Sequence, residues 1–584
     1  MKQILKYLKP YRASVVLSLL LAGINHGLHV LLPAMMSLVI NNGIGKNDMQ
    51  YVKKMGFLMV AAAFIALGFG VASSYFTSKC STGFGKEVRR AVFKKTQSLS
   101  GSDISDISPA SLLIRSTNDI NQTQMILQNC LRMLMSALVM MVGGTVMSFI
   151  MNKKLSACLF GVLFVIVIIV VLISKKIIPM YSVVQKKMDK LNAVIREKLS
   201  GIRVVRAFNK SEYEDGRFDE SNDELASTYV RINRIYAKVL PIGIMALFSL
   251  IVVLVFINCR QIMDMDVGAH REEIANTVGN LQAFVVYVVM IVAAITMATS
   301  VFVMIPKAMI SVDRINEILS KEPGIKECDD PKPFAERGSV EFKNVSFSYP
   351  GDEVERLSDV SFTIEKGKTT AFIGSTGSGK TTIISLMTRM YDVERGEVLV
   401  GGVNVKELSK SDLASAVSLV SQKTMLFSGN IMDNVRFGND SLSDEDVIRA
   451  CRVAQVDEFA QQMPEKYDTM IYQEGKNLSG GQKQRISIAR GIAKQADIYV
   501  FDDSFSALDF ATDKKVRDAI GEELKGKTVV IIAQRIGSIL DADKIIVLGE
   551  GKVVGTGTHT QLSESCPLYQ DIVRSQLSKE GDGE

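Results

Sequence analysis

Six long apolar stretches constrain this chain more than any other feature of its sequence. They cover residues 14–40, 55–77, 131–151, 155–178, 239–259 and 277–305. A helix needs roughly 20 predominantly apolar residues to cross the hydrocarbon core of a bilayer. The first stretch is the least regular, because Asn25, His26, His29 and Pro33 interrupt it. The pattern predicts six membrane-spanning helices, with the lipid bilayer as a partner.

The connections between these stretches indicate how the chain is oriented. Those after the second and fourth stretches are long, helical in pattern and basic, with residues such as Arg89, Arg90, Lys186 and Lys187. Basic loops stay on the cytoplasmic side, so we expect both long loops and both termini in the cytoplasm. The N-terminal MKQILKYLKPYR is basic and amphipathic and is followed by no signal-peptide cleavage site, which favours an interfacial helix before a retained span. The expected location is the plasma membrane, crossed several times.

Charge and cysteine content narrow the choice of partners. The net charge is +6 over 584 residues. Because the basic residues lie beside apolar stretches, membrane orientation explains them, and we expect no nucleic-acid partner. The seven cysteines are scattered, without a CxxC or Cys/His cluster. This pattern argues against a disulfide framework and against a cysteine-based metal site.

A change in composition after the last apolar stretch predicts a second domain. Residues 319–337 are polar and contain three prolines, which is typical of a linker. Short β-like runs then alternate with helical stretches, as in "SVEFKNVSFSY", "TTAFIG" and "TVVIIAQ", and this alternation indicates an α/β domain. We therefore expect a transmembrane domain over 1–318, a linker over 319–337, an α/β domain over 338–578 and a tail over 579–584.

The sequence GSTGSGKT, from Gly374 to Thr381, fits the pattern of a phosphate-binding P-loop. It follows an apolar run and opens a helical one, which is the context that the motif requires. Backbone N–H groups and the helix N-terminus then surround phosphate oxygens. We expect Lys380 to contact the β- and γ-phosphates of ATP and Thr381 to bind Mg²⁺. The expected nucleotide-contacting residues are Gly374, Ser375, Thr376, Gly377, Ser378, Gly379, Lys380, Thr381 and Thr382.

A second motif, LSGGQ, extends from Leu478 to Gln482 and opens a basic helix. Alone, Ser-Gly-Gly before a helix is only a capped N-terminus. Between a P-loop and a buried strand that ends in Asp502, it is far more specific. With these motifs the chain resembles an ATP-binding cassette (ABC) transporter, of the exporter-type half-transporter class, over essentially its whole length. The implied fold class is an α-helical six-span transmembrane domain followed by an α/β P-loop nucleotide-binding domain.

The resemblance implies roles for further residues of the nucleotide-binding domain. Tyr349 is similar to the aromatic residue that stacks on adenine, although a strand-end core tyrosine has the same appearance. Gln422 is similar to the Q-loop glutamine, which touches Mg²⁺, and Asp502 to the aspartate that holds Mg²⁺ through water. Asp509 resembles the D-loop aspartate. The expected cofactors are thus ATP and Mg²⁺.

Two further segments resemble those through which the transmembrane and nucleotide-binding domains of this family contact each other. Residues 472–477, YQEGKN, stand where the X-loop contacts the long membrane loops. Residues 209–218, NKSEYEDGRF, resemble a coupling helix that docks on a nucleotide-binding domain. A charged, solvated turn is the competing interpretation of the second segment.

The family resemblance also implies that each ATP lies between the P-loop of one domain and the LSGGQ of another, so this chain needs a second one. At its own P-loop site, Asp503 stands where active members carry the general base Glu, and Gln534 replaces the switch histidine. A shorter arm withdraws the carboxylate from its water, and a glutamine cannot carry positive charge. The signature residues Ser479, Gly480, Gly481 and Gln482, which serve the partner's site, are intact.

This asymmetry resembles the degenerate-site subunit of a heterodimeric ABC exporter. The expected partner is a different half-transporter with Glu and His in its ATP site. A slow homodimer is the second hypothesis. Engineered inactivation is less natural, since Glu→Gln is the usual change.

The transported substrate is the least constrained property. Polar residues inside apolar stretches are candidates for its site: Asn25, His26, His29, Gln282, Tyr287, Thr296 and Thr299. Hydrogen bonds between helices explain each of them equally well. Abundant methionines suit an adaptable apolar cavity or ordinary packing. A small or amphipathic, multidrug or lipid-like substrate is the first expectation and a peptide the second; an exporter-fold importer or a regulated channel stays open.

Overall fold

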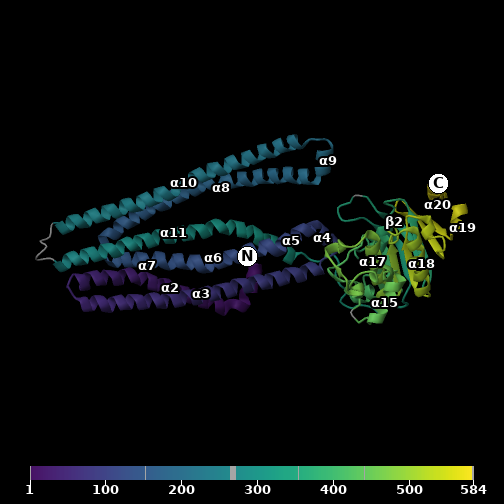
Figure 1. Cartoon of the computed structure of the whole chain (residues 1–584), viewed down its shortest axis with the longest axis horizontal. Coiled ribbons are helices and arrows are strands. Elements are labelled where there is room, and N and C mark those ends of the chain that lie inside the picture. Colours follow the sequence, from purple (N-terminus) through teal and green to yellow (C-terminus); the bar gives the residue numbers. More distant parts are fainter. Residues whose placement is uncertain (1, 152, 264–270, 353, 440, 582–584) are drawn as a thin grey trace. The chain divides into compact units, whose positions relative to one another are not determined.

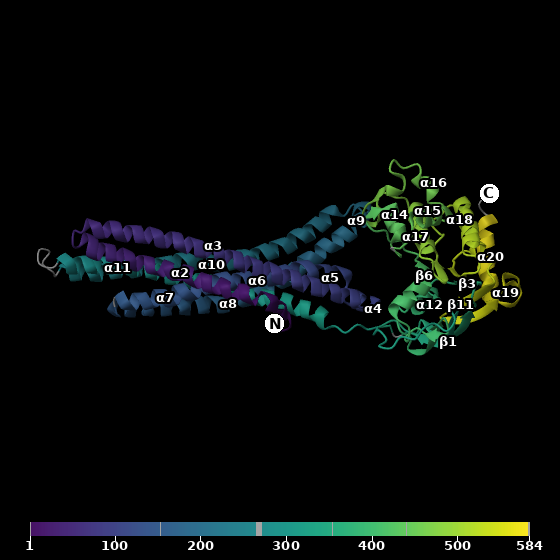
Figure 2. The ribbon, with the colours of Figure 1, turned by 90° about the horizontal axis from the view of Figure 1, so that it is seen from below.

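The computed structural model describes residues 2–151, 153–263, 271–352, 354–439 and 441–581. The chain forms two compact units, which are drawn in Figures 1 and 2. The first contains Met1–Lys95 and Ala110–Lys321, and the second contains Thr96–Pro109 and Glu322–Glu584.

Long helices make up the first unit. The described helices are α1 (Lys2–Leu5), α2 (Arg12–Leu38), α3 (Met49–Ser98), α5 (Pro109–Ile114), α6 (Ile120–Asn129), α7 (Met135–Met151), α8 (Lys153–Ser200), α9 (Ile202–Ala207), α10 (Ser211–Met263) and α11 (Arg271–Ser320). A 3₁₀ turn, η1 (Lys6–Tyr11), precedes α2. Three π-helical turns interrupt the regular helices: η2 (Val39–Ile44), η3 (Arg115–Asp119) and η4 (Cys130–Leu134).

All six predicted apolar stretches are helical, and they lie in α2 with η2, α3, η4 with α7, α8, α10 and α11. Among the described residues, four helical segments have the length and composition to cross a membrane: Gln3–Ile44, Met49–Ser98, Pro109–Met151 and Arg271–Ser320. The N-terminal helical transmembrane region is therefore confirmed. The count of six spans stays a prediction, which rests on α8 and α10 for its fourth and fifth members.

Helix α11 packs against α2, α6 and α7, while α8 and α10 pack against each other. The buried Tyr287 hydroxyl of α11 donates to Val30 O at 3.0 Å. Val184, Leu191, Leu225 and Ile232 form the apolar contact between α8 and α10. Figures 1 and 2 show these two helices joined through α9. Most of the predicted coupling segment 209–218 lies in the first turns of α10, where Arg217 pairs with Glu214 and Glu197.

Two main sheets form the centre of the second unit. A six-stranded sheet has the order β12-β11-β3-β10-β9-β6, and a four-stranded sheet has the order β2-β1-β4-β5. The first is parallel except at β12. Its strands are β3 (Thr369–Gly374), β6 (Val417–Val420), β9 (Ile498–Asp502), β10 (Thr528–Ile532), β11 (Lys544–Gly549) and β12 (Lys552–Gly557). The second sheet, which is antiparallel, contains β1 (Val340–Phe347), β2 (Leu357–Ile364), β4 (Arg395–Val400) and β5 (Val403–Asn404).

Helices and a small ribbon surround these sheets. They are α12 (Lys380–Met387), α13 (Lys410–Ala416), α14 (Ile431–Arg436), α15 (Asp444–Val453), α16 (Asp457–Ala460), α17 (Gly480–Ala493), α18 (Phe510–Glu523), α19 (His559–Ser565) and α20 (Pro567–Gly581), with β7 (Gly429–Asn430) paired to β8 (Met470–Ile471). One core fills the space between the two main sheets, and another joins α14, α15 and α17 to β9. The expected α/β domain is confirmed. Helix α20 continues to Gly581, past the predicted start of the tail at residue 579, because no helix breaker precedes that glycine.

The second unit includes a short segment that lies far from the α/β domain in sequence and was expected in the transmembrane domain. Helix α4 (Gly101–Ile107) is capped by Ser100, whose hydroxyl accepts from Asp103 N while the Asp103 carboxylate accepts from Ser100 N. Asp103 Oδ2 also accepts from the backbone N–H of Gly324 at 2.9 Å. One carboxylate thus ties the first of the two long predicted loops to the segment that leads into the α/β domain.

Candidate nucleotide site

The carboxyl ends of three neighbouring parallel strands build the site. Strands β3, β10 and β9 lie side by side in register, so the segments that follow them meet at one edge of the sheet, where open α/β sheets bind their ligands. Gly374 ends β3, Asp502 ends β9, and Gln534 follows β10 by two residues. The fold therefore brings together residues that are far apart in the chain.

Glycines give the P-loop its shape. A Cβ atom at Gly374 would lie 2.2 Å from the carbonyl oxygen of Leu548, so only glycine fits this close approach. Gly379 has a φ of +102°, and a Cβ there would meet Leu357 Cδ2 at 2.6 Å. It precedes the first turn of α12, which directs free N–H groups toward the loop. These constraints leave Ser375, Thr376 and Gly377 exposed as a backbone cradle.

Lys380 lies within this cradle. Its Nζ donates to Gly374 O at 2.7 Å, to Ser375 O at 2.8 Å and to Ser378 Oγ at 3.3 Å. Burial lowers the pKa of Lys380, while the charges of Asp502 and Asp503 raise it. The ammonium is therefore held inside the loop and near the two carboxylates, at the position where phosphate oxygens would bind.

Residues around the P-loop have separate contacts. Thr381 is exposed in the first turn of α12, whereas Thr382 is buried and its hydroxyl lies 3.1 Å from the Tyr349 hydroxyl. The half-buried Tyr349 ring also packs edge-on against Phe347 and Tyr391. These contacts place the Tyr349 ring beside the start of α12.

The two acidic residues after β9 have different surroundings. Asp502 is buried, and its pKa rises to about 6 because of burial and the charge of Asp503, with Lys380 opposing the rise. Asp503 is half-buried and has a φ of +46°, a conformation that aspartate tolerates better than most residues. Its Oδ2 accepts from Gln422 Nε2 and from Gln534 Nε2, each at 2.9 Å. We call these three side chains, Gln422, Asp503 and Gln534, the amide–carboxylate cluster.

The backbone of the Gln534 segment is held by Gln576, a residue that no sequence motif indicated. Gln576 of α20 donates from Nε2 to Gln534 O at 2.7 Å, and its Oε1 accepts from Ile536 N at 2.8 Å. Arg517 of α18 donates to Gly537 O at 3.0 Å while it pairs with Asp513. No local pattern marks Gln576, because its contact depends on how α20 returns to the sheet.

The LSGGQ residues form a helix N-terminus of their own. Ser479 Oγ accepts from Gln482 N at 3.3 Å, and Ser479 N donates to Gln482 Oε1 at 2.9 Å, which is a capping box. Ser479 and Gly480 are exposed, and a Cβ at Gly480 would meet no atom within 4 Å. These side chains thus bond to each other rather than to the amide–carboxylate cluster. The first N–H groups of α17 lie at an exposed helix N-terminus, where they have no partner within the helix.

Other predicted residues have mainly structural contacts. The Asp509 carboxylate caps α18 by accepting from Thr512 N at 3.0 Å, and this bond lowers the pKa of Asp509. In the segment 472–477, Asn477 accepts from Tyr472 N and donates to Met470 O. Among the described residues, no cluster of three or more His, Cys, Asp or Glu side chains is placed to hold a metal ion.

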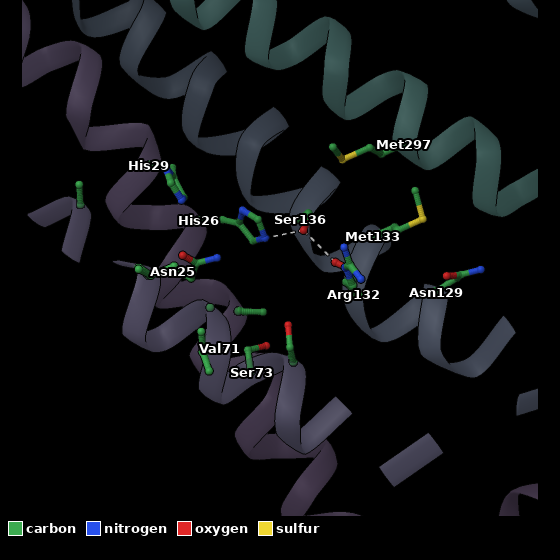
Figure 3. Close-up of a pocket in the computed structure, with 15 residues that line it drawn as sticks. Asn25, His26, His29, Val71, Ser73, Asn129, Arg132, Met133, Ser136 and Met297 are labelled. Carbon is green, nitrogen blue, oxygen red and sulfur yellow. Dashed lines mark hydrogen bonds between the residues drawn. The ribbon is translucent and has the colours of Figure 1, made fainter. Parts of the chain in front are cut away.

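In the helical unit, the predicted polar residues divide into two groups. Thr296 and Thr299 donate to backbone oxygens of their own helix, and Tyr287 is buried with its hydroxyl bonded to Val30 O. Asn25, His26 and His29 instead line a cavity, shown in Figure 3. Gln282 lines an adjoining cavity with the same two histidines.

Comparisons with known proteins agree with this arrangement. Residues 15–295 match the family model "ABC transporter transmembrane region", and residues 357–506 match the model "ABC transporter". An ABC transporter ATP-binding protein of Mycobacterium tuberculosis is 34% identical over 576 residues, covering 98% of this chain and 97% of the relative. The Bacillus subtilis protein YfiB, also named an ABC transporter ATP-binding protein, is 31% identical over 584 residues, covering 100% and 99%.

Among solved structures, a bacterial Atm1-family ABC exporter with ATP bound has a TM-score of 0.76 at 22% identity, covering 97% of this chain and 98% of that one. This likeness shows the fold. Together with the curated relatives, it establishes that the chain belongs to the ABC transporter family, as a membrane protein that joins a helical transmembrane region to an ATP-binding domain.

Proposed function

We propose that this chain is one subunit of a heterodimeric ABC exporter, and that its own P-loop site binds ATP but hydrolyses it weakly. The observation that carries the proposal is the amide–carboxylate cluster, in which two glutamine amides share one oxygen of Asp503. The transported substrate is small or amphipathic, and the ATP-binding domain and both termini are cytoplasmic.

ATP binding by this chain follows from the P-loop geometry. Backbone N–H groups from Gly374 to Thr381 and the start of α12 surround the phosphates, Lys380 supplies a positive charge, and Tyr349 offers a ring face to adenine. The residues also fit Mg²⁺, since Thr381, Gln422 and Asp502 present oxygen donors at one sheet edge and the raised pKa of Asp502 reflects a buried carboxylate that a cation would stabilise. When bound, Mg²⁺ supplies charge neutralisation for the phosphates.

Weak hydrolysis follows from the reach and partners of Asp503. A general base must lie within about 2.6–3.2 Å of the proton that it removes. The aspartate arm is one methylene shorter than that of glutamate, and two amides hold its Oδ2. Gln534 donates to this carboxylate and cannot itself carry a positive charge. Positioning dominates phosphoryl transfer, so a displaced base lowers turnover by about 10²-fold or more.

A different partner follows from the intact signature. Two copies of this chain would place Asp503 and Gln534 in both sites, leaving no efficient one. A partner that carries Glu and His would use the free N–H groups of Gly480 and Gly481 at its own site. The α8–α10 hairpin ends in exposed apolar side chains, with Phe208 73% and Tyr213 64% exposed, a surface suited to a second chain.

Two mutant complexes test this assignment. In the complex that co-purifies with a tagged chain from its own cells, Asp503→Ala should change ATPase activity less than about threefold, because its site already lacks an effective base. Ser479→Ala should lower it about 10²–10³-fold, the usual cost of losing one preorganised donor at a reacting centre.

The capping box requires a matched control, because Ser479→Ala also removes a helix cap worth ~1 kcal/mol. Thr558 caps α19 in the same type of capping box with Gln561, so Thr558→Ala separates cap loss from signature loss. If Asp503→Ala abolishes the ATPase activity while Ser479→Ala leaves it unchanged, the assignment of the two sites is reversed. Full ATPase activity of the chain purified alone would favour the homodimer.

Separate measurements distinguish an exporter of small amphiphiles from an importer, a regulated channel and a peptide transporter. ATP-driven uptake of substrate into inside-out vesicles distinguishes export from import, because an importer would move the substrate the opposite way. Conductance across a planar bilayer distinguishes a regulated channel from a pump. A peptide substrate would stimulate the ATPase where small amphiphiles do not.

A further inference from the structure

A cavity inside the helical unit has an unusual set of polar side chains. It measures about 890 Å³ and is walled by the middle of α2, the facing part of α3, the end of α6, η4, the start of α7 and one residue of α11. Its residues from α2 and α3 belong to the centres of the first two apolar stretches. In Figure 3, the labelled side chains of His26, Arg132 and Ser136 converge on one space.

Arg132 is the permanent charge in this wall. It lies on the π-helical turn η4, and its side chain is exposed to the cavity rather than packed between helices. π-Helical turns are rare and frequently occur at functional sites. Ser136, one turn further on, donates to Arg132 O at 2.8 Å and is also bonded to His26 Nε2. The turn that carries Arg132 is thereby fixed relative to α2.

Among the residues that the structure describes, no counter-charge accompanies this arginine. The residues that line the cavity include two histidines and one arginine but neither Asp nor Glu. Within the described part of the chain, no carboxylate forms an ion pair with Arg132. A charged side chain among membrane helices is costly and is usually paired. The cavity therefore offers a planar guanidinium whose natural complement is an anion from outside the chain.

The remaining lining suits an apolar body. Met133 and Met297 face the same cavity as Arg132, and an adjoining cavity of about 550 Å³ shares His26, His29 and Met297 and adds further methionines. Methionine side chains adapt to irregular apolar shapes. Asn25 and Ser136 add hydrogen-bonding groups near the charged end.

We propose that this cavity binds amphipathic organic anions, with Arg132 holding a carboxylate or phosphate head and the methionine-lined space holding the apolar tail. The proposal deepens the proposed function, since it names the substrate class of the transporter. An arginine fork binds such heads through two parallel hydrogen bonds, and His26 and Ser136 complete the polar end.

Equilibrium binding tests the proposal without ATP. The full chain in phosphatidylcholine nanodiscs is titrated with pyrenedodecanoic acid and with the same pyrene chain ending in trimethylammonium, and empty nanodiscs give the background. The acid should bind tightly and the cation should not. Arg132→Gln should weaken acid binding about 10- to 100-fold, the range for losing a charge-assisted hydrogen bond. Arg132→Lys should keep part of the affinity, since it retains the charge.

A matched control uses Arg231→Gln, which removes the same charge from an exposed position on α10 away from the cavity, and it should bind like the wild type. Binding of a fluorescent ATP analogue verifies that each variant is folded. Wild-type acid affinity in Arg132→Gln, or equal binding of acid and cation, would overturn the proposal. Loss of acid binding that Arg132→Lys does not restore at all would also overturn the role of charge.

Two further arms identify the source of the anion and separate this proposal from the function beneath it. Competition by phosphatidic acid added to the nanodiscs supports a membrane lipid as the ligand, while undisturbed binding of the pyrene acid supports a free amphiphile. If the complex does not hydrolyse ATP, the proposed function as a pump fails, but the conclusion that the cavity binds anions does not depend on that result. If the Arg132→Gln chain keeps wild-type acid affinity and its complex transports at the full ATP-driven rate, only the proposed anion site fails, and the proposed function stands.

Discussion

Asp503→Glu should restore hydrolysis most strongly when Gln534 is also replaced by His. Both side chains meet at one oxygen, because Gln534 Nε2 donates to Asp503 Oδ2 at 2.9 Å. A lengthened carboxylate that still accepts this amide bond is held away from the attacking water. Residues in direct contact have coupled effects, so neither single change should give the full gain.

The magnitude follows from the contacts. General-base catalysis contributes about 10²–10⁴ in rate, and part of this returns with the glutamate arm. Gln534 is exposed, so its hydrogen bond to the carboxylate is worth ~1 kcal/mol, which corresponds to about fivefold. We expect about 20-fold or more from Asp503→Glu, less than about threefold from Gln534→His, and an additional factor of about five in the double variant.

The assay is steady-state ATPase activity of the chain purified alone and reconstituted in lipid. A homodimer of the double variant would combine the restored P-loop site with the intact Leu478–Gln482 signature, so no other subunit contributes background. Asp541→Glu, at an exposed position outside the cluster, controls for the added methylene. A double variant no faster than Gln534→His would show that the reach of Asp503 does not limit turnover, and the reasoning from arm length would fail.

Three other predictions concern groups that hold the site. Gly379→Ala should weaken binding of a fluorescent ATP analogue at least tenfold, since its φ of +102° and the 2.6 Å approach to Leu357 exclude a methyl group; Gly521→Ala in α18, where a Cβ meets nothing within 4 Å, should leave binding unchanged. Gln576→Ala should speed hydrogen exchange at Ile536 N about fivefold, because that amide loses its acceptor, whereas Gln576→Glu should keep most of the protection; equal exchange in all three proteins would exclude the contact. Because the pKa of Asp502 rises from 3.8 to about 6 on folding, the folded state holds an extra proton in that window, and the free energy of unfolding should fall by roughly 3 kcal/mol as pH increases from about 4 to 6. Thermal unfolding in Mg²⁺-free buffer measures this loss, and Asp502→Asn, which cannot titrate, should abolish it.

Sequence motifs indicate the candidate site where local chemistry determines it. The P-loop needs glycines at fixed offsets, so Gly374 and Gly379 could be assigned before any contact was known. The strand that ends in Asp502 was visible as a short apolar run before a carboxylate. Parallel strands then place these ends together, which made the approach of Gln534 to the acidic pair foreseeable in outline.

What the motifs could not give depends on distant parts of the chain. The shared oxygen of Asp503 depends on rotamers from three separate loops, and Gln576 reaches the Gln534 segment only because α20 returns to the sheet. The link from Asp103 to Gly324 joins residues 221 positions apart. Arg132 was hidden for another reason: it lies at the edge of an apolar stretch, where an arginine is ordinary, and only packing shows that it lines a cavity.

The capping box at Ser479 and Gln482 has a consequence for how two chains would come together. The first turn of α17 is already fixed by its own side chains, so its N–H groups need no ordering when ATP held by another chain reaches them. Preorganised surfaces lose little conformational freedom on association. In the proposed dimer, the entropic barrier to closure therefore arises from moving whole domains, and the signature behaves as a rigid template. The rate at which the dimer closes should therefore depend more on solvent viscosity, which slows domain motion, than on substitutions that stabilise α17.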